Sequence, residues 1–464
     1  MTAQGPTTTL RSRLVGATLW IILGTVSQHL LRLVSNLIVT RLLAPDMFGV
    51  MAVATTVPVI MALLSDIGLT PNIVRSPWGD DPVFLDTAWT VSIVRGLLMW
   101  TGAVCVAMGL YFASAAGMLD PQSTYANPVL PWVIGISSLT SVLMGFGSTK
   151  LATAVRHFNS RGLVRIDVLS ALAGVTAMVL GAWLTRSIWA LVASGLVGGL
   201  CHTLLSHVML PGHRNRLHWD RQALERLLSF GKWLFLSSAI SVFAMQGDRL
   251  MLAGFVEAHV LGMYSIALAL VSVLDGGILQ LFDKVFLPAF SEVARRSEEA
   301  VPGAFFRLRR RLDPVMVTAA GMLFAAGPTI VGLMYDPRYA SAGHMLSVLS
   351  LGLMVSRYSL AQQVYLALNR PQYQVTLNFV RFVSIYALVP IGYRLWGLEG
   401  ALYAIALREL PVVPLIFWFN ARHRLNNLRL ELASLLFWPL GYAIGEMAQR
   451  AVHLVLHAVR GVGV

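Results

Sequence analysis

Two charged residues, Asp248 and Arg249, stand side by side in the stretch FAMQGDRLML, inside an apolar run from Phe230 to Val256. A run of this length predicts a membrane-spanning helix, and the pair falls near its middle. A charged side chain at that depth costs about 2.5–3.5 kcal/mol, so such residues commonly serve a function. Arginine keeps its charge when buried and presents a planar fork to phosphate, which makes anion binding the chemistry that Arg249 could perform.

The composition predicts an all-α polytopic membrane protein. The 464 residues are 56% hydrophobic and only 12% charged, with a mean hydropathy of +0.69, whereas globular domains carry about 25% charged residues. Windows of about 20 residues predict twelve spans. These spans lie near 14–40, 47–66, 88–111, 128–149, 166–185, 188–210, 230–256, 259–282, 314–335, 343–368, 375–393 and 396–419. The apolar tail 432–464 could be one span or a tight pair.

Basic residues divide unequally between the two sides that these spans define. One side carries 23 Lys and Arg, in the N-terminus and in segments 67–87, 150–165, 211–232, 284–313, 369–374 and 420–431. The other side carries four: Arg41, Arg186, Arg338 and Arg394. The positive-inside rule therefore places the N-terminus in the cytoplasm and explains the net charge of +13 without a nucleic acid partner. The two long basic loops should lie on anionic membrane lipid.

The sequence offers no pattern typical of an enzyme or of a metal site. It contains no Gly-rich phosphate loop, no HExxH and no GxSxG motif. Cys105 and Cys201 both lie in predicted spans, far from any metal-type spacing, and are interpreted as packing residues. We therefore expect a protein that is not an enzyme and that holds no cofactor or metal.

An internal repeat predicts two similar halves. RLLAPDMFGVMAVA and GFVEAHVLGMYSIA have the same order of polar turn, glycine and small-residue helix, and their glycines, Gly49 and Gly262, are 213 residues apart. Six spans separate the copies, so both halves face the same way. The sequence thus predicts two six-helix bundles related by a pseudo-two-fold axis along the membrane normal. The predicted lobes are 1–212 and 213–430, with one or two further apolar segments in 431–464.

The first helix of each predicted half carries a polar stripe. At 100° per residue, six residues of the first span fall within roughly 120° of one face: Thr25, Gln28, His29, Arg32, Ser35 and Asn36. Residues Ser238, Ser241, Asp248 and Arg249 fall within roughly 100° in the seventh span. Gln246 lies close by. Such corresponding stripes predict that both helices line one water-filled cavity.

Further arginines within predicted spans make that cavity cationic. They are Arg95, Arg357, Arg381 and Arg408. We expect Arg32, Arg249, Arg95, Arg357 and Arg381 to contact a substrate phosphate, and Asp248, Gln28, His29, Asn36 and Gln246 to line the cavity or to couple an ion. The alternative is that each arginine pairs with an acid or with helix carbonyls. Asp248 is open to two interpretations, orienting a neighbouring arginine or carrying a coupling proton.

Several motifs in order resemble a known family. RLLAPDMFGVMAVA, SDIGLTPNIVRSP, GDRLMLAGFVEAHVLGMYSIA, KVFLPAFSEV and LALNRPQY, spread over residues 14–420, are similar to the polysaccharide transporter or oligosaccharide flippase family (Wzx-type). This family belongs to the multidrug/oligosaccharidyl-lipid/polysaccharide exporter superfamily. One departure is Ala44, at a position where the first motif has glycine.

The resemblance implies a flippase of the bacterial inner membrane. Its implied cargo is a polyprenyl-pyrophosphate-linked oligosaccharide for exopolysaccharide, O-antigen (lipopolysaccharide) or capsule synthesis, moved by alternating access of two lobes. A proton or sodium gradient, or removal of the product by later enzymes, would supply the energy. A polysaccharide polymerase and a co-polymerase are the partners that such a pathway implies.

Two other functions compete with the flippase. A cation-coupled multidrug exporter of the same superfamily would need cavity acids, and the first span has none. A membrane-embedded polysaccharide polymerase or ligase would act on the same substrates, but it would need a large outward loop with catalytic residues. The longest predicted outward loop, 112–127, is short.

Overall fold

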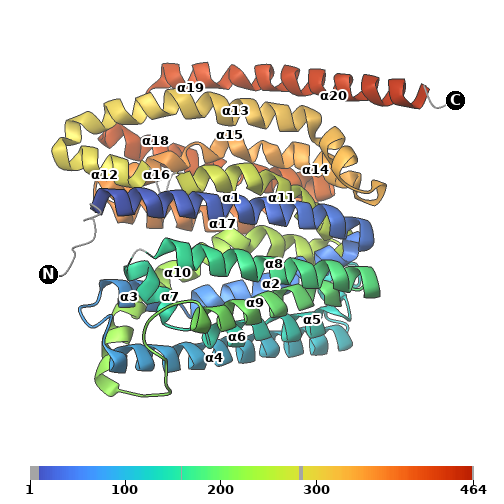
Figure 1. Ribbon diagram of the computed structural model, residues 1–464. Helices are drawn as coiled ribbons and strands as arrows, with labels where there is room; N and C mark the ends of the chain where they lie inside the picture. The colour runs from blue at the N-terminus through green and yellow to red at the C-terminus, as the bar shows by residue number, and fades with distance from the viewer. Residues whose placement is uncertain (1–9, 158, 282–285, 462–464) are drawn as a thin grey trace. The chain divides into compact units, whose positions relative to one another are not determined.

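Every regular element in the described part of the chain is a helix, as the apolar runs predict. The structure is a computed structural model that describes residues 10–157, 159–281 and 286–461 (Figure 1). The side chains of residues 10–19, 21–23, 25, 26, 29, 228–239, 277–281, 288 and 455–461 are outside this description. The all-helical class expected from the sequence is confirmed.

The chain packs into two compact units, residues 1–121 with 125–242, and residues 122–124 with 243–464. Helix α10 crosses this boundary, because Val242 closes the first unit and Phe243 opens the second. The lobe limits expected from the repeat, at 212/213 and 430/431, and the two-fold relation between lobes stay predictions.

Several helices of unit 1 begin at residues that favour a helix start. Proline stands at the first positions of α2 and α4, where its missing N–H is not needed. Asp81 caps α4 by accepting the Phe84 N–H, and Asn159 caps α8 by accepting the Gly162 N–H. The elements are α1 Leu10–Leu42, α2 Pro45–Leu64, α3 Leu69–Arg75, α4 Pro82–Ala115, α5 Leu130–Ser137, α6 Leu139–Gly145, α7 Lys150–Arg156, α8 Ser160–Thr185, α9 Trp189–Val208 and the first part of α10 Arg221–Phe255, with the short turn η1 Thr124–Ala126 near the boundary.

Unit 2 combines long helices with one heavily broken segment. Its elements are the end of α10, α11 Ala258–Leu281, α12 Leu287–Arg296, η3 Glu298–Ala300, α13 Val301–Met334, η4 Pro337–Tyr339, α14 Ser341–Ser350, α15 Gly352–Ser356, α16 Ser359–Ala367, α17 Pro371–Ala406, η5 Leu410–Val412, α18 Val413–Arg422, α19 Leu428–Leu435 and α20 Phe437–Gly461. The predicted span 343–368 is therefore three short helices, α14 to α16.

Seven described helices are long and apolar enough to cross a membrane, and one bent pair could add an eighth. The seven are Pro45–Leu64, Pro82–Ala115, Ser160–Thr185, Trp189–Val208, Ala258–Gly276, Glu298–Met334 and Pro371–Ala406. The bent pair is Leu130–Gly145 with Lys150–Arg156, which turn by 60°. Helices α1 and α10 are as long, at 33 and 35 residues, and contain the two polar stripes.

Helix α17 accounts for two predicted spans because it is bent. The backbone leaves the helical region at Trp396 and Gly397, and Gly397 has φ +60° and ψ −145°. That conformation favours glycine, which has no Cβ to clash. The two arms then meet at Gly392 and Gly400, where an added Cβ would lie 2.5 Å or less from the opposite backbone.

The C-terminal tail, left open by the sequence, forms one long helix after α19. Helix α20 packs along α13 in the same direction, so that Gly441 meets Thr318 and Gly445 meets Met322 and Ala325 (Figure 1). Small residues allow such close approach between membrane helices. Helix α13 contains one of the candidate spans, whereas α20 is not among the described helices that are long and apolar enough to cross a membrane, so whether the tail adds a span stays a prediction.

Gly321 supplies a matched test of this contact. A Cβ at Gly321 would lie 2.3 Å from the Trp438 carbonyl oxygen, whereas a Cβ at Gly332, on the same helix, would meet no heavy atom within 4 Å. We expect Gly321→Ala to lose about 1–3 kcal/mol of stability through overpacking. Gly332→Ala should not lower the thermal midpoint, since alanine favours helix. Thermal unfolding of the detergent-purified variants measures both, and equal midpoints would contradict the close α13–α20 contact.

Candidate functional site

The polar stripe of α1 is only partly buried within unit 1. Arg32 and Gln28 are exposed and Asn36 is half-buried, while the His29 side chain lies outside the described residues. Among the described side chains, no acid forms an ion pair with Arg32. Arg32 therefore remains a cation that an anionic ligand could neutralise.

Arg95 makes helix-end contacts instead. Its Nε donates to Ser65 Oγ at 3.1 Å, and its Nη2 donates to the Ala62 carbonyl oxygen at 2.7 Å. These acceptors lie at the C-terminal end of α2, where carbonyls lack helical partners. Arg95 thus follows the alternative in which an arginine is satisfied by helix carbonyls.

Asp248 lies at the centre of a buried polar cluster in unit 2. Its side chain is 4% exposed, and it accepts a hydrogen bond from the Tyr264 hydroxyl. Arg408 Nη1 lies 3.9 Å from the same carboxylate oxygen, Oδ2. Asp248 therefore faces an arginine from a distant part of the chain, as one of the two sequence interpretations requires.

Arg249 has a different environment from its neighbour. Its Nη1 donates to Gln246 Oε1 at 3.5 Å, which is a long hydrogen bond within one helix turn. No described acid pairs with Arg249. Three buried polar atoms on α10 and α17 have no hydrogen-bond partner among the described residues: Asp248 Oδ1, Arg249 Nε and the Tyr386 hydroxyl. Unpaired buried polar atoms are uncommon and mark a place for water, a proton or a ligand.

Arg381 is held by a fork-shaped ion pair. Its Nε and Nη2 donate to the two Glu409 carboxylate oxygens at 2.5 and 2.9 Å, and Nη1 donates to Asn378 Oδ1 at 2.5 Å. Both charged side chains are mostly buried, at 14% and 20% exposed. Because all three nitrogen atoms are engaged, Arg381 has less capacity for a phosphate than the sequence analysis expected.

Arg357 belongs to a second buried cluster, which we name the C-terminal charge cluster: Arg309, Asp313, Arg357 and Glu431. Arg309 donates to both Glu431 oxygens and, at 2.6 Å, to Asp313. Arg357 lies 3.3 Å from Glu431 and 3.7 Å from Asp313, and it donates to Ser434 Oγ. The cluster joins α13, the end of α15 and α19.

The C-terminal charge cluster is electrically balanced, with two guanidinium and two carboxylate groups. Burial opposes the charge on Glu431, but the hydrogen bonds and charge of Arg309 outweigh this effect and hold the pKa of the Glu431 carboxyl below its usual value. Arg309, Asp313 and Glu431 were not among the site residues expected from the sequence. The spacing of Arg309 and Asp313, four residues apart, was a usable signal, whereas nothing local pointed to Glu431.

The five arginines expected to bind phosphate thus fall into two groups. Arg95, Arg357 and Arg381 have protein partners, which are acids for Arg357 and Arg381, although Arg357 Nε itself has no partner among the described residues. Arg32 and Arg249 have no acidic partner among the described residues. The assignment of all five to substrate stays a prediction, but the contacts favour the last two.

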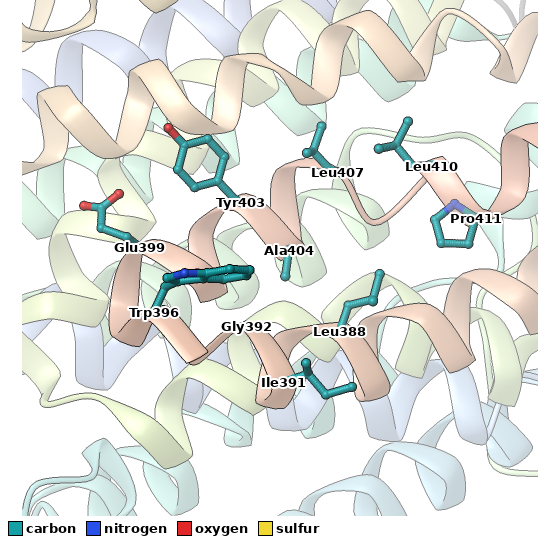
Figure 2. A pocket seen from close by; sticks show the side chains of 11 residues that line it. Leu388, Ile391, Gly392, Trp396, Glu399, Tyr403, Ala404, Leu407, Leu410 and Pro411 are labelled. Atoms are coloured by element: carbon teal, nitrogen blue, oxygen red, sulfur yellow. The ribbon is translucent and has the colours of Figure 1, made fainter. Parts of the chain in front are cut away.

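A separate apolar pocket lies in the bend of α17 (Figure 2). Its volume is about 540 Å³, and it opens between the arm that carries Leu388 and Ile391 and the arm that carries Ala404 and Leu407. Glu399 is the one acidic group in its lining, and His344 pairs with it at 3.0 Å. The pocket is suited to a hydrocarbon chain, whereas the buried arginines lie elsewhere in unit 2. No three His, Cys, Asp or Glu side chains of the described chain gather as a metal site.

Comparison with known proteins identifies relatives over most of the chain. The family profile described as "Polysaccharide biosynthesis protein" matches residues 38–342. The lipopolysaccharide biosynthesis protein WzxC of Escherichia coli (strain K12) is 24% identical over 409 residues, which cover 86% of this chain and 79% of that protein. The succinoglycan biosynthesis transport protein ExoT of Rhizobium meliloti (strain 1021) is 23% identical over 330 residues, 68% of this chain and 64% of that protein.

Solved structures share the fold at low identity. An inward-facing multidrug resistance MATE family transporter of the MOP superfamily has a TM-score of 0.65 and 14% identity, covering 86% of this chain and 94% of its own. The lipid II flippase MurJ in an inward closed conformation has a TM-score of 0.64 and 14% identity, covering 94% and 99%. The fold is therefore that of a membrane transporter.

The Arg381–Glu409 pair can be tested with a double-mutant cycle. Arg381→Gln should destabilise the protein by about 3–5 kcal/mol, because it leaves the Glu409 carboxylate buried without its partner. Removing both charges, in Arg381→Gln/Glu409→Gln, should recover most of that loss. Thermal unfolding of the purified variants measures the coupling. Additive losses would mean that the two residues act independently, and Arg381 would return to the set of substrate contacts.

Proposed function

Since the chain belongs to the polysaccharide biosynthesis protein family, we propose that it is a flippase for polyprenyl-pyrophosphate-linked oligosaccharides in the bacterial inner membrane. The observation that carries this proposal is the family match over residues 38–342 on a chain with the fold of a membrane transporter. The product would serve exopolysaccharide, O-antigen or capsule synthesis. The relatives' names describe transport and polysaccharide synthesis, and the chain is a transporter rather than an enzyme.

Arg32 and Arg249 are the proposed contacts of the pyrophosphate. The headgroup of such a lipid is anionic and hydrated, so hydrocarbon excludes it, while the polyprenyl tail can remain in the membrane. Guanidinium groups without acidic partners can replace the lost hydration by donating to phosphate oxygens in pairs. The two arginines lie on the two pseudo-equivalent polar stripes of the sequence. Movement of the headgroup would follow from alternating access of the two lobes around a cationic cavity.

Asp248 is the proposed site of energy coupling. Its Oδ1 atom is buried without a hydrogen-bond partner among the described residues, while Oδ2 accepts from Tyr264. A proton or a sodium ion taken by Oδ1 would weaken the attraction between Asp248 and Arg408, which are 3.9 Å apart. Coupling would thus act by changing which residues neutralise Arg408. Later enzymes, a polymerase with its co-polymerase, would remove the product and give the same direction to transport.

The charge pairing disfavours a multidrug exporter of organic cations. Such a function needs carboxylates that are free to bind the cargo. In unit 2, Glu409, Asp313 and Glu431 are instead paired with arginines, and Asp248 faces Arg408 through Oδ2, which leaves only its Oδ1 unpartnered. The polymerase or ligase alternative finds no support in the relatives' names, which describe biosynthesis and transport.

The central experiment is complementation of a chromosomal deletion. Arg32→Ala and Arg249→Ala should each reduce surface polysaccharide export at least tenfold while protein remains in the membrane. Arg32→Lys keeps the charge but loses the fork, and it should retain partial export. Arg165→Ala removes another exposed arginine, on α8, and should export normally. Wild-type export by both alanine variants would exclude the proposed phosphate contacts.

The side on which substrate accumulates tests the direction of transport. A deletion strain should accumulate lipid-linked oligosaccharide on the cytoplasmic leaflet, because the headgroup cannot cross alone. Protection of these lipids from a periplasmically added glycan-cleaving enzyme measures the side. If the repeat units instead appear unpolymerised on the periplasmic side, the protein acts after translocation, and this result would support the polymerase alternative.

A further inference from the structure

The helix α20 carries a polar stripe that the transport proposal does not use. Glu446, Gln449, Arg450 and His453 are spaced i, i+3, i+4 and i+7, which places them on one face of the helix. Arg450 Nε donates to Glu446 Oε1 at 3.1 Å within the helix. The Arg450 side chain is 75% exposed and the Glu446 side chain is 35% exposed, and His453 is exposed as well. We define these four residues as the α20 stripe.

The α20 stripe begins beside the apolar part of α13. Gly445, one residue before Glu446, meets Met322 and Ala325 of α13, and the apolar part of α13 runs from Pro314 to Met334. Glu446 is therefore near the middle of the apolar layer, and Arg450 lies about 6 Å further along at 1.5 Å per residue. Charged side chains at that depth face protein or a water-filled cavity rather than lipid.

The described part of the chain covers the α20 stripe only in part, because Glu446 and Gln449 are half-buried while Arg450 and His453 are exposed. The extensive contacts of α20 are with α13 and, at its start, with α19. These contacts use Gly441, Gly445 and Trp438 on the neighbouring face of the helix, while Tyr442, one turn before Glu446, contacts Phe324 from the side of the stripe itself. The single Glu446–Arg450 bond leaves most donors of the guanidinium and most acceptor positions of the carboxylate unused. In lipid, no water is present to form hydrogen bonds with these unused donors and acceptors.

We propose that a second copy of this chain covers the α20 stripe, forming a homodimer through parallel α20 helices. The stripe contains one acid and one base, so it is complementary to itself. Two copies inserted in the same direction present parallel α20 helices, and a two-fold axis along the membrane normal brings the two stripes together. Glu446 of each copy then lies within one helical turn of Arg450 of the other, within reach of an arginine side chain.

Apolar residues beside the stripe complete the proposed contact. Ala443 is exposed on the same side of α20, together with Met447 at 63% and Leu454 at 71% exposure. Ala443 allows close helix approach, as small residues do between membrane helices. An interface of this kind combines paired charges at its centre with apolar side chains around them. The proposal concerns assembly and does not depend on the transported substrate.

Charge reversal in trans distinguishes pairing between copies from pairing within one helix. Glu446→Arg makes the charged part of the stripe entirely basic, and Arg450→Glu makes it entirely acidic. In lipid nanodiscs, the full-length wild type should have the mass of a dimer, and each variant alone should be monomeric. Differently tagged copies of the two variants, expressed together, should copurify as a mixed pair. Neither variant retains its intrahelical pair, so only contact between copies explains that recovery.

Arg221→Glu is the matched control for charge reversal. Arg221 and Glu225 also form an ion pair four residues apart, on α10, with side chains that are 90% and 68% exposed. This variant should remain dimeric. A wild type that is monomeric in nanodiscs overturns the proposal, and so does failure of the two reversed variants to copurify. Purification with a different membrane protein bound in place of the second copy overturns it as well.

Cross-linking supplies a readout that does not alter the stripe. In a background with Cys105→Ala and Cys201→Ala, Ala443→Cys should form a disulfide between two copies in native membranes. Ile391→Cys places a thiol at a 52% exposed position on α17 and should remain monomeric under the same oxidation. Equal cross-linking at both positions, or none at residue 443, would show that α20 is not the contact.

Discussion

A guanidinium group in the interior of a membrane protein keeps its charge, because its pKa is too high for burial to remove the proton. Each buried arginine therefore has to find a carboxylate or several oxygen atoms, wherever in the chain these lie. Unit 2 meets this requirement with Glu409 for Arg381 and with Asp313 and Glu431 for Arg309 and Arg357. The Arg309–Glu431 pair ties together α13 and α19 across 122 residues of chain. Removing one partner would leave an unpaired charge in the core.

The same requirement separates structural arginines from those suited to ligand. Arg95 binds oxygen atoms at the end of α2, and Arg357 and Arg381 bind acids. Arg32 and Arg249, on the two polar stripes, have no acidic partner among the described residues. A translocated pyrophosphate would then act as the missing counter-charge, present during transport and absent afterwards. Asp248, bonded to Tyr264 and facing Arg408, adds a carboxylate next to Arg249 on α10 of unit 2.

Close backbone contacts give unit 2 its framework around these charges. Gly321, Gly441 and Gly445 bring α13 and α20 together, and Gly392 and Gly400 bring together the two arms of α17. The bend of α17 also encloses an apolar pocket that is distinct from the arginine clusters. A lipid-linked substrate has both a charged headgroup and a long hydrocarbon chain. The separation of apolar and charged regions suits such a molecule.

The sequence by itself determined the helical membrane class, most span positions and the two polar stripes, because hydropathy and helical period are local properties of the chain. The bend at Trp396 and Gly397 lay within three residues of a predicted gap between spans. Only the tertiary structure decided which arginines are neutralised, since pairing depends on which helices become neighbours. Glu431 illustrates this point: it stood in a loop beyond the predicted spans, yet it neutralises Arg309 and Arg357. The course of the tail was likewise decided by packing. The glycines of α20 allow a close helix contact only because they face the surface of α13.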